Sequence, residues 1–188
     1  MRITGGTLGG RKLNTPEGKT TRPTSDRVRE ALFDIIAHHD WGEKIGNPLE
    51  NRRVLDAFAG TGALGLESLS RGANECIFFE KDRNALKSLR DNIALLNQRP
   101  KSKILPIDAT HPPKTDTPCS LVFLDPPYYK NLIPKTLEVL NKMRWITPEA
   151  LIIAETARGE SLEMPPTLQQ LLARDYGDTS LLFFGKRG

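Results

Sequence analysis

The architecture of this 188-residue chain follows from one run, Leu121-Val122-Phe123-Leu124-Asp125-Pro126-Pro127-Tyr128-Tyr129. Its first four residues are apolar and predict a short strand buried on both faces. The strand has to end at Asp125, because neither proline can donate a backbone hydrogen bond to a neighbouring strand. A carboxylate therefore stands at the carboxyl end of a core strand, which is the edge where open α/β sheets bind ligands.

Apolar runs on both sides of this strand predict a layered α/β protein. Further strands are expected at 54–58, 76–79, 103–107, 151–155, 171–176 and 180–186. Helices are expected after the glycines at 60–65, after Asp82 and over 132–142. The last two strands are joined by Gly177-Asp178-Thr179, a turn so short that they must pair antiparallel. The sequence thus predicts an α/β fold, a Rossmann-like, doubly wound mixed sheet of about seven strands with a C-terminal antiparallel hairpin.

A small hairpin-plus-helix extension is expected to precede the sheet. Glycine pairs at 5–6 and 9–10 predict a hairpin over residues 1–13, and Thr24 or Ser25 can cap a following helix. The apolar residues that share one side of this helix are Val28, Ala31, Leu32, Ile35 and Ile36. Arg29, Glu30 and Phe33 are expected to point away from this apolar side of the helix. Within the sheet, the strand over 103–107 is expected to end in Asp108. We expect one domain over 1–188, with an N-terminal extension at 1–50 and a core at 51–188, and residues 40–51 are expected to form a linker.

Acidic residues at three other strand ends surround a glycine-rich turn. Asp56 precedes Gly60, Gly62 and Gly65, which satisfy GxGxxG, and Glu80 follows about twenty residues later at the end of the next strand. That spacing also fits a nicotinamide dinucleotide, so the alternative stays open. However, Asp56 would repel a pyrophosphate, whereas it can pair with an ammonium group. S-adenosylmethionine, which has an ammonium group, a ribose and an adenine but no phosphate, matches the set better, with Asp108 available to the adenine amino group.

The charge is concentrated near the N-terminus. Within residues 1–29, seven cations stand against two acids, although the net charge of the whole chain is only +4. Such clustering is typical of a polyanion-binding arm, and an ordinary solvated basic surface is the alternative. The candidates for phosphate contacts are Arg11, Lys12, Arg22 and Arg27.

Several classes of protein are disfavoured by composition. No apolar run is long enough to span a membrane, and the first residues lack the apolar core of a signal peptide. Cys76 and Cys119 lack CxxC spacing and are expected to be buried thiols in a reducing cytoplasm. The three histidines have no metal-ligand spacing, so no metal is expected.

Taken together, these motifs resemble the S-adenosylmethionine-dependent amino-methyltransferases. The N-terminal runs 2–6, 10–13 and 22–30 are similar to one branch, the bacterial 16S ribosomal RNA guanine-N2 methyltransferases of the RsmD type. The resemblance implies a substrate in 16S rRNA, within a small-subunit particle, and a monomer is the default expectation. The cofactor residues that it implies are Asp56, Phe58, Gly60, Gly62, Glu80, Asp108 and Ala109. The catalytic turn maps onto Asp125, Pro126, Pro127 and Tyr128. Some relatives carry Phe in place of Tyr128, which predicts that its hydroxyl is dispensable.

Four other functions fit parts of the pattern. A DNA adenine-N6 methyltransferase shares the Asp-Pro-Pro-Tyr turn, but a core at 52–188 leaves few residues for a separate DNA-recognition domain. A protein-amide methyltransferase would more naturally carry Asn at position 125. A non-enzymatic RNA-binding domain leaves the four acidic strand ends without a role. A nicotinamide reductase has no use for the Asp-Pro-Pro-Tyr turn, and cofactor binding would separate it.

Overall fold

The computed structural model describes residues 1–15 and 25–187, and its centre is a seven-stranded mixed sheet in the order β3-β2-β1-β4-β5-β7-β6. The strands are β1 Arg53–Asp56, β2 Glu75–Phe79, β3 Ser102–Leu105, β4 Cys119–Leu124, β5 Ile146–Ala157, β6 Leu168–Tyr176 and β7 Thr179–Lys186. The first five pair in parallel, and β7 runs antiparallel to both β5 and β6. The predicted doubly wound sheet with its C-terminal hairpin is confirmed.

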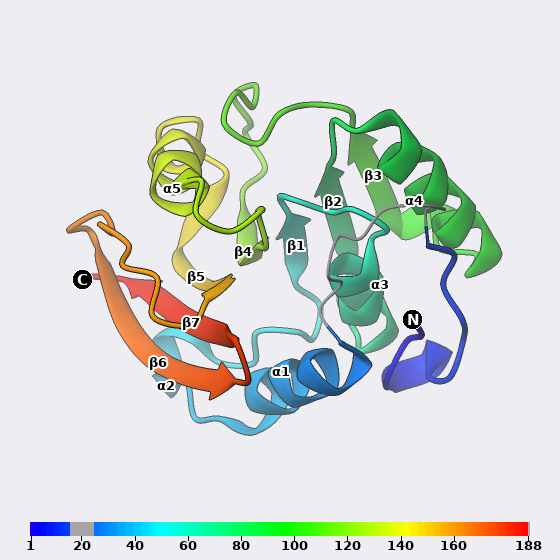
Figure 1. The fold of residues 1–188 in the computed structure, drawn as a ribbon, viewed down its shortest axis with the longest axis horizontal. Coiled ribbons are helices and arrows are strands. Elements are labelled where there is room, and N and C mark those ends of the chain that lie inside the picture. The colour runs from blue at the N-terminus through cyan, green and yellow to red at the C-terminus, as the bar shows by residue number, and fades with distance from the viewer. Residues whose placement is uncertain (16–24, 188) are drawn as a thin grey trace.

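Helices cover the two faces of this sheet unequally. They are α1 Asp26–His38, α2 Gly42–Ile45, α3 Ala63–Ser70, α4 Arg83–Leu95 and α5 Leu132–Lys142, with short 3-10 turns at Gly6–Leu8 and Arg99–Lys101. One cluster of buried side chains packs α1, α3 and α4 against one face of the sheet, to which Val54 of β1 belongs. A second cluster packs α5 against the other face, to which the next residue, Leu55, belongs. Figure 1 shows the N-terminal segment beside α3 and α4, at the opposite end of the molecule from the β6–β7 hairpin.

The side chains that cap the N-termini of α1 and α4 are those that the sequence predicted. The Ser25 hydroxyl accepts a hydrogen bond from the Val28 N–H at 3.2 Å, and the Asp82 carboxylate accepts from the N–H groups of Asn84 and Ala85. Both side chains satisfy backbone donors that have no partner in the first helical turn. The predicted starts of α1, at Ser25, and of α4 are therefore confirmed.

Three local predictions were wrong. Arg29 and Phe33 were expected to point away from the core, but both are completely buried, because α1 presents a wider face to the sheet than its aliphatic residues indicated. The segment expected as a linker contains α2, and its Trp41 is buried against the core and donates to the Ile36 carbonyl at 2.9 Å. Strand β3 ends at Leu105, so Asp108 lies in the following loop rather than at the strand end.

The N-terminal residues form a hairpin only in part. A single antiparallel bridge pairs Arg2 with Lys12, and the Ile3 N–H donates to the Arg11 carbonyl at 2.9 Å.

Within the described residues, no helix is long and apolar enough to cross a membrane.

Candidate active site

A cavity of about 600 Å³ opens at the carboxyl ends of β1, β2 and β4. It lies where the strand order reverses between β1 and β4, the usual ligand position in such sheets. Its volume suits a ligand of nucleoside size. The predicted site residues that line it are Asp56, Phe58, Gly60, Glu80, Asp108, Ala109, Asp125, Pro126, Pro127 and Tyr128. Among the residues predicted to bind the cofactor or to form the catalytic turn, Gly62 alone does not line the cavity.

The glycines of the turn have different tasks. Gly60 has a φ of +55° and nothing within 4 Å of the position of a Cβ, so its backbone is open to a ligand. Gly62 has a φ of +83°, and a Cβ there would come within 2.4 Å of Leu89. Gly65, within α3, packs so closely on Phe78 that a Cβ would approach it to 2.3 Å. Gly60 therefore serves the cavity, whereas Gly62 makes room for Leu89 of α4 and Gly65 lets α3 pack closely on β2.

Asp56, the last residue of β1, is almost completely buried, with 1% exposed. Its Oδ2 accepts a hydrogen bond from the Gly65 N–H at 3.1 Å. Burial is the main cause that raises the pKa of Asp56 to about 7; the Gly65 N–H opposes the rise, and the Glu80 charge contributes to it. A carboxyl group poised in this way can ionise when a cationic group of a ligand comes to lie beside it.

Glu80 follows β2 and organises the backbone around the cavity. Its Oε2 accepts from the Gly60 N–H at 2.8 Å. Its Oε1 accepts from the N–H groups of Lys81 and Asp82 at 2.8 and 2.7 Å. A carboxylate offers about four acceptor positions, so these three bonds leave roughly one for a ligand hydroxyl.

Asp108 lines the cavity from the loop after β3 and is paired with a lysine. Lys81 Nζ is 2.6 Å from Asp108 Oδ2, and the Thr110 hydroxyl and N–H both donate to Oδ1. The hydrogen bond from Lys81 is the largest cause that holds the pKa of Asp108 well below its ordinary value. Asp108 is therefore an ionised acceptor, and Ala109 beside it is buried and apolar.

The Asp-Pro-Pro-Tyr turn is tied to the sheet by its tyrosine. The Tyr128 hydroxyl donates to Glu155 Oε1 at 2.9 Å and lies 3.1 Å from the Thr179 hydroxyl. Burial raises the pKa of Tyr128 above its ordinary value, and the charge of Glu155 adds to the rise. Asp125 is half-buried directly after β4, and Pro126 is buried. The hydroxyl thus orients the ring.

A buried ion cluster that the sequence did not predict lies beside the cavity. The Glu67 side chain in α3 is completely buried and accepts from the Thr4 N–H, the Gly5 N–H and Arg71 Nε at 2.8 to 2.9 Å. Arg29 Nε lies 3.5 Å from Glu67, and Arg29 also lines the cavity. One signal for Arg29 was available, because positions 29, 32, 33 and 36 have the i, i+3, i+4, i+7 spacing of a buried helix face.

The residues predicted to contact phosphates are exposed where the structure describes them. Arg11, Lys12 and Arg27 are all exposed, while Arg22 lies outside the described residues. The buried Asn92 of α4 fixes the end of this segment, since its Oδ1 accepts from the Asn14 N–H at 2.7 Å and its Nδ2 donates to the carbonyls of Asn14 and Thr61 at 3.0 Å. One side chain thus joins the arm to the glycine turn.

Several known proteins that are similar to this chain carry names of methyltransferases. Residues 1–185 match the family model described as "Conserved hypothetical protein 95". The chain is 36% identical over 166 residues to the "Ribosomal RNA small subunit methyltransferase D" of Escherichia coli strain K12, covering 88% of this chain and 79% of that protein. It is 32% identical to the protein of the same name from Haemophilus influenzae, over 96% of this chain and 91% of the relative. A solved Escherichia coli structure, described as "Putative methyltransferase yhhF", has a TM-score of 0.84 and 33% identity, covering 100% of this chain and 98% of that one.

Proposed function

Because this chain belongs to the family of the ribosomal RNA small subunit methyltransferases D, we propose that it methylates the exocyclic N2 of a guanine in 16S rRNA, with S-adenosylmethionine as methyl donor. One observation carries the proposal. The acidic residues at the end of β1 and after β2 and β3 line a single cavity together with the Asp125–Tyr128 turn. A donor site and a site for a planar amino substrate are thus contiguous.

The residues of the cavity fit S-adenosylmethionine better than a dinucleotide. In this proposal Asp56 pairs with the ammonium group, Glu80 uses its remaining acceptor position for a ribose hydroxyl, and Asp108 accepts from the adenine amino group; all three line the cavity. The backbone at Gly60 is open to a ligand. The acidic lining disfavours a pyrophosphate. When bound, the donor supplies a methyl group that its sulfonium already activates.

Asp125 and the turn prepare the substrate nitrogen. An exocyclic amino group is a poor nucleophile because its lone pair is delocalised into the ring. The Asp125 carboxylate and the Pro126 carbonyl accept the two amino hydrogens, which directs the lone pair toward the methyl group. Asp125 then takes the proton that the nitrogen loses after it has become cationic. The Tyr128 ring gives the flipped base a stacking face, and positioning provides most of the catalysis.

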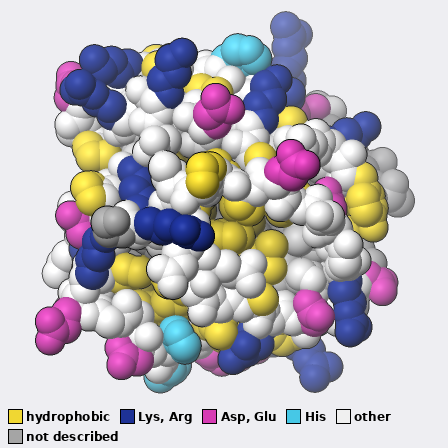
Figure 2. Space-filling view, turned by 90° about the vertical axis from the view of Figure 1, so that its left-hand side faces the viewer, with side chains coloured by type: hydrophobic (Ala, Val, Ile, Leu, Met, Phe, Trp, Pro, Cys, Tyr) yellow, Lys and Arg dark blue, Asp and Glu magenta, His cyan; other side chains and the backbone are white. Residues whose placement is uncertain are grey.

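The N-terminal extension over residues 1–50 supplies RNA affinity that does not depend on sequence. Arg11, Lys12 and Arg27 are exposed and can contact phosphates. On the face around the β6–β7 end, by contrast, basic and acidic side chains are interspersed among apolar ones (Figure 2). We place the substrate in a small-subunit particle in the cytoplasm and expect one domain acting as a monomer. The alternative, a DNA adenine-N6 methyltransferase, is not favoured by the names of the relatives.

The test is a methylation assay on small ribosomal subunits from a strain that lacks this modification. We expect label from S-adenosylmethionine to enter N2-methylguanosine, identified by mass spectrometry of the nucleosides, and naked 16S rRNA to be a poorer substrate. The Asp125→Ala variant serves as the control for contaminating activity. Methyladenosine as the product, or methylation of duplex DNA but not of RNA, would contradict the proposal.

A further inference from the structure

Tyr129, next to the catalytic turn, carries the most exposed large apolar side chain of the described residues. It is 74% exposed, whereas Leu95 and Leu171, the next in order, are 50% and 37% exposed. Single exposed apolar residues are ordinary on protein surfaces. This ring, however, directly follows Tyr128, which lines the cavity.

The backbone at Tyr129 is held in an unfavourable conformation. Its φ is +58°, in the left-handed region that bulky side chains rarely adopt. The Tyr129 N–H donates to Glu160 Oε1 at 3.0 Å, and Glu160 Oε2 accepts from the Thr156 hydroxyl at 2.6 Å. Strained positions that are held by surrounding bonds cluster at functional sites. Here the bonds from Glu160 hold the ring outside the cavity, although glycine would suit the backbone better.

The relative orientation of the two tyrosine rings gives them different partners. Their centroids are 6.5 Å apart and their planes are at 89°. Two perpendicular rings cannot both stack on the same base. The base that Tyr128 contacts in the cavity continues into an RNA strand, so the adjacent nucleotide has to lie just outside the cavity mouth. That is where Tyr129 stands, beside the exposed Lys130.

We infer that Tyr129 is a substrate-positioning residue, whose ring stacks on the nucleotide next to the target guanine and so fixes the register of the RNA strand. The inference rests on the proposed function. A planar face suits any base, so the ring adds affinity more than sequence selectivity. Its contribution belongs to substrate binding and not to the chemical step, since the ring lies outside the cavity that holds Asp125.

The experiment measures kcat and KM for unmodified small ribosomal subunits with Tyr129 variants. Loss of one base–aromatic stack predicts a rise in KM of about 5- to 160-fold for Tyr129→Ala, with kcat little changed. Tyr129→Phe and Tyr129→Trp should stay near the parent protein, whereas Tyr129→Leu, apolar but not planar, should resemble Tyr129→Ala. Leu95→Ala, which removes an exposed side chain from the end of α4, is the matched control and should leave KM unchanged.

A further variant separates substrate contact from a structural role. Tyr129→Gly relieves the positive φ, so its thermal midpoint should equal or exceed that of the parent protein while KM rises as for Tyr129→Ala. Affinity for S-adenosylmethionine should be the same in all variants. An unchanged KM in Tyr129→Ala, or Leu serving as well as Phe, would overturn the inference while the proposed function stands. If the parent protein does not methylate the subunits, the proposed function fails and the inference falls with it.

Discussion

Replacing Glu80 by alanine tests the proposed cofactor site most directly. Three of its roughly four acceptor positions are taken by the N–H groups of Gly60, Lys81 and Asp82, so about one remains for a ribose hydroxyl. A hydrogen bond to a charged acceptor contributes about 1.5–3 kcal/mol. We therefore expect Glu80→Ala to raise the Kd for S-adenosylmethionine about 10- to 150-fold, since each 1.4 kcal/mol is a factor of ten.

The isosteric change Glu80→Gln makes the test sharper. A glutamine keeps one acceptor oxygen, so its NH₂ group must face either the Gly60 N–H or the N–H groups of Lys81 and Asp82, donor against donor. We expect Gln to be no better than Ala, despite its nearly identical size.

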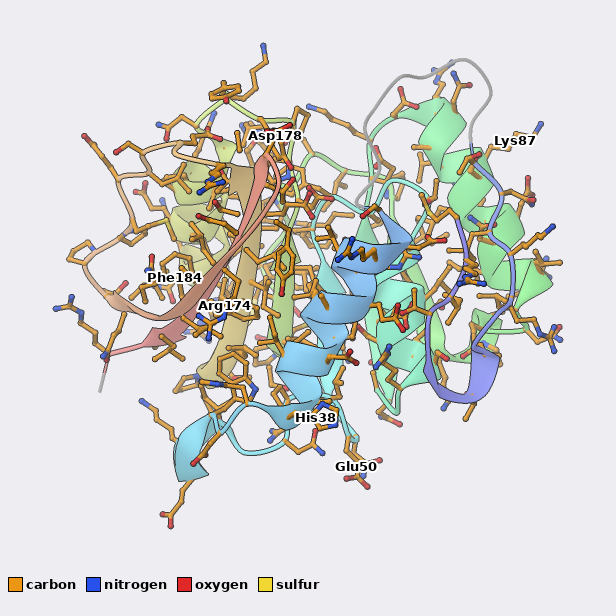
Figure 3. The ribbon with its side chains drawn as sticks, turned by 60° about the horizontal axis from the view of Figure 1, so that its bottom comes forward. His38, Glu50, Lys87, Arg174, Asp178 and Phe184 are labelled. Atoms are coloured by element: carbon orange, nitrogen blue, oxygen red, sulfur yellow. The ribbon has the colours of Figure 1, made fainter. Side chains whose placement is uncertain are left out.

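Isothermal titration calorimetry with S-adenosylmethionine measures both variants against Glu50→Ala as control. Glu50 is an exposed carboxylate just before β1, and so lies at the amino-terminal end of this strand, whereas the cavity lies at its carboxyl end. Figure 3 shows Glu50 extending from the surface near His38. Thermal unfolding without ligand shows whether the apo fold is kept. A Kd within twofold of the parent value in Glu80→Ala would remove this residue from the cofactor site.

Four further results are expected. Asp125→Ala should lose nearly all kcat in the methylation assay with little change in cofactor Kd, and near-normal turnover would refute the mechanism. Replacing Arg11 and Lys12 together by alanine should lower the slope of log affinity against log salt by about 1.4 in filter binding to single-stranded RNA, two contacts at about 0.7 each, and an unaltered slope would exclude them as phosphate contacts. Burial raises the pKa of Asp56 from 3.8 to about 7, so between these values the folded state holds a proton that the unfolded chain has released. The free energy of unfolding measured in urea titrations should therefore fall as pH rises from about 4 to about 7. Asp56→Asn should lack this dependence. Glu67→Ala leaves buried cations without their carboxylate and should lower the free energy of unfolding by about 3–5 kcal/mol, whereas a loss below about 1 kcal/mol would mean that the cluster rearranges.

The parts of the fold that sequence predicted well are those with local causes. The strand before Asp125 is an apolar run ended by prolines, and Asp82 begins α4 because its side chain caps the next turn. The cavity lining was predictable because the carboxyl ends of parallel strands meet at one edge. These features depend on a few adjacent residues and on a general rule of sheet topology.

The features that sequence did not predict depend on partners far along the chain. Glu67 lies in an almost entirely buried helix, and nothing near it indicates that it accepts hydrogen bonds from the backbone of residues 4 and 5 and lies beside the Arg29 guanidinium. Arg29 was expected to point away from the core because it lies off the aliphatic face of the helix, and its burial is allowed by ion pairs with Asp26 at 2.8 Å and with the distant Glu67 at 3.5 Å. The acceptor role of Glu80 toward the glycine turn was missed because a ribose contact had already explained its position.

The attachment of the N-terminal segment has a consequence for synthesis on the ribosome. Its bonds to α3 join residues more than sixty positions apart, and its bond from Asn14 to Asn92 spans 78. At 5–20 residues per second, about 4–16 seconds separate the synthesis of this segment from that of its last docking partner. During that interval the nascent chain carries its basic residues without the helices that orient them. We therefore expect the basic residues of this segment to take the positions that they have in the folded protein only after α4 has been made.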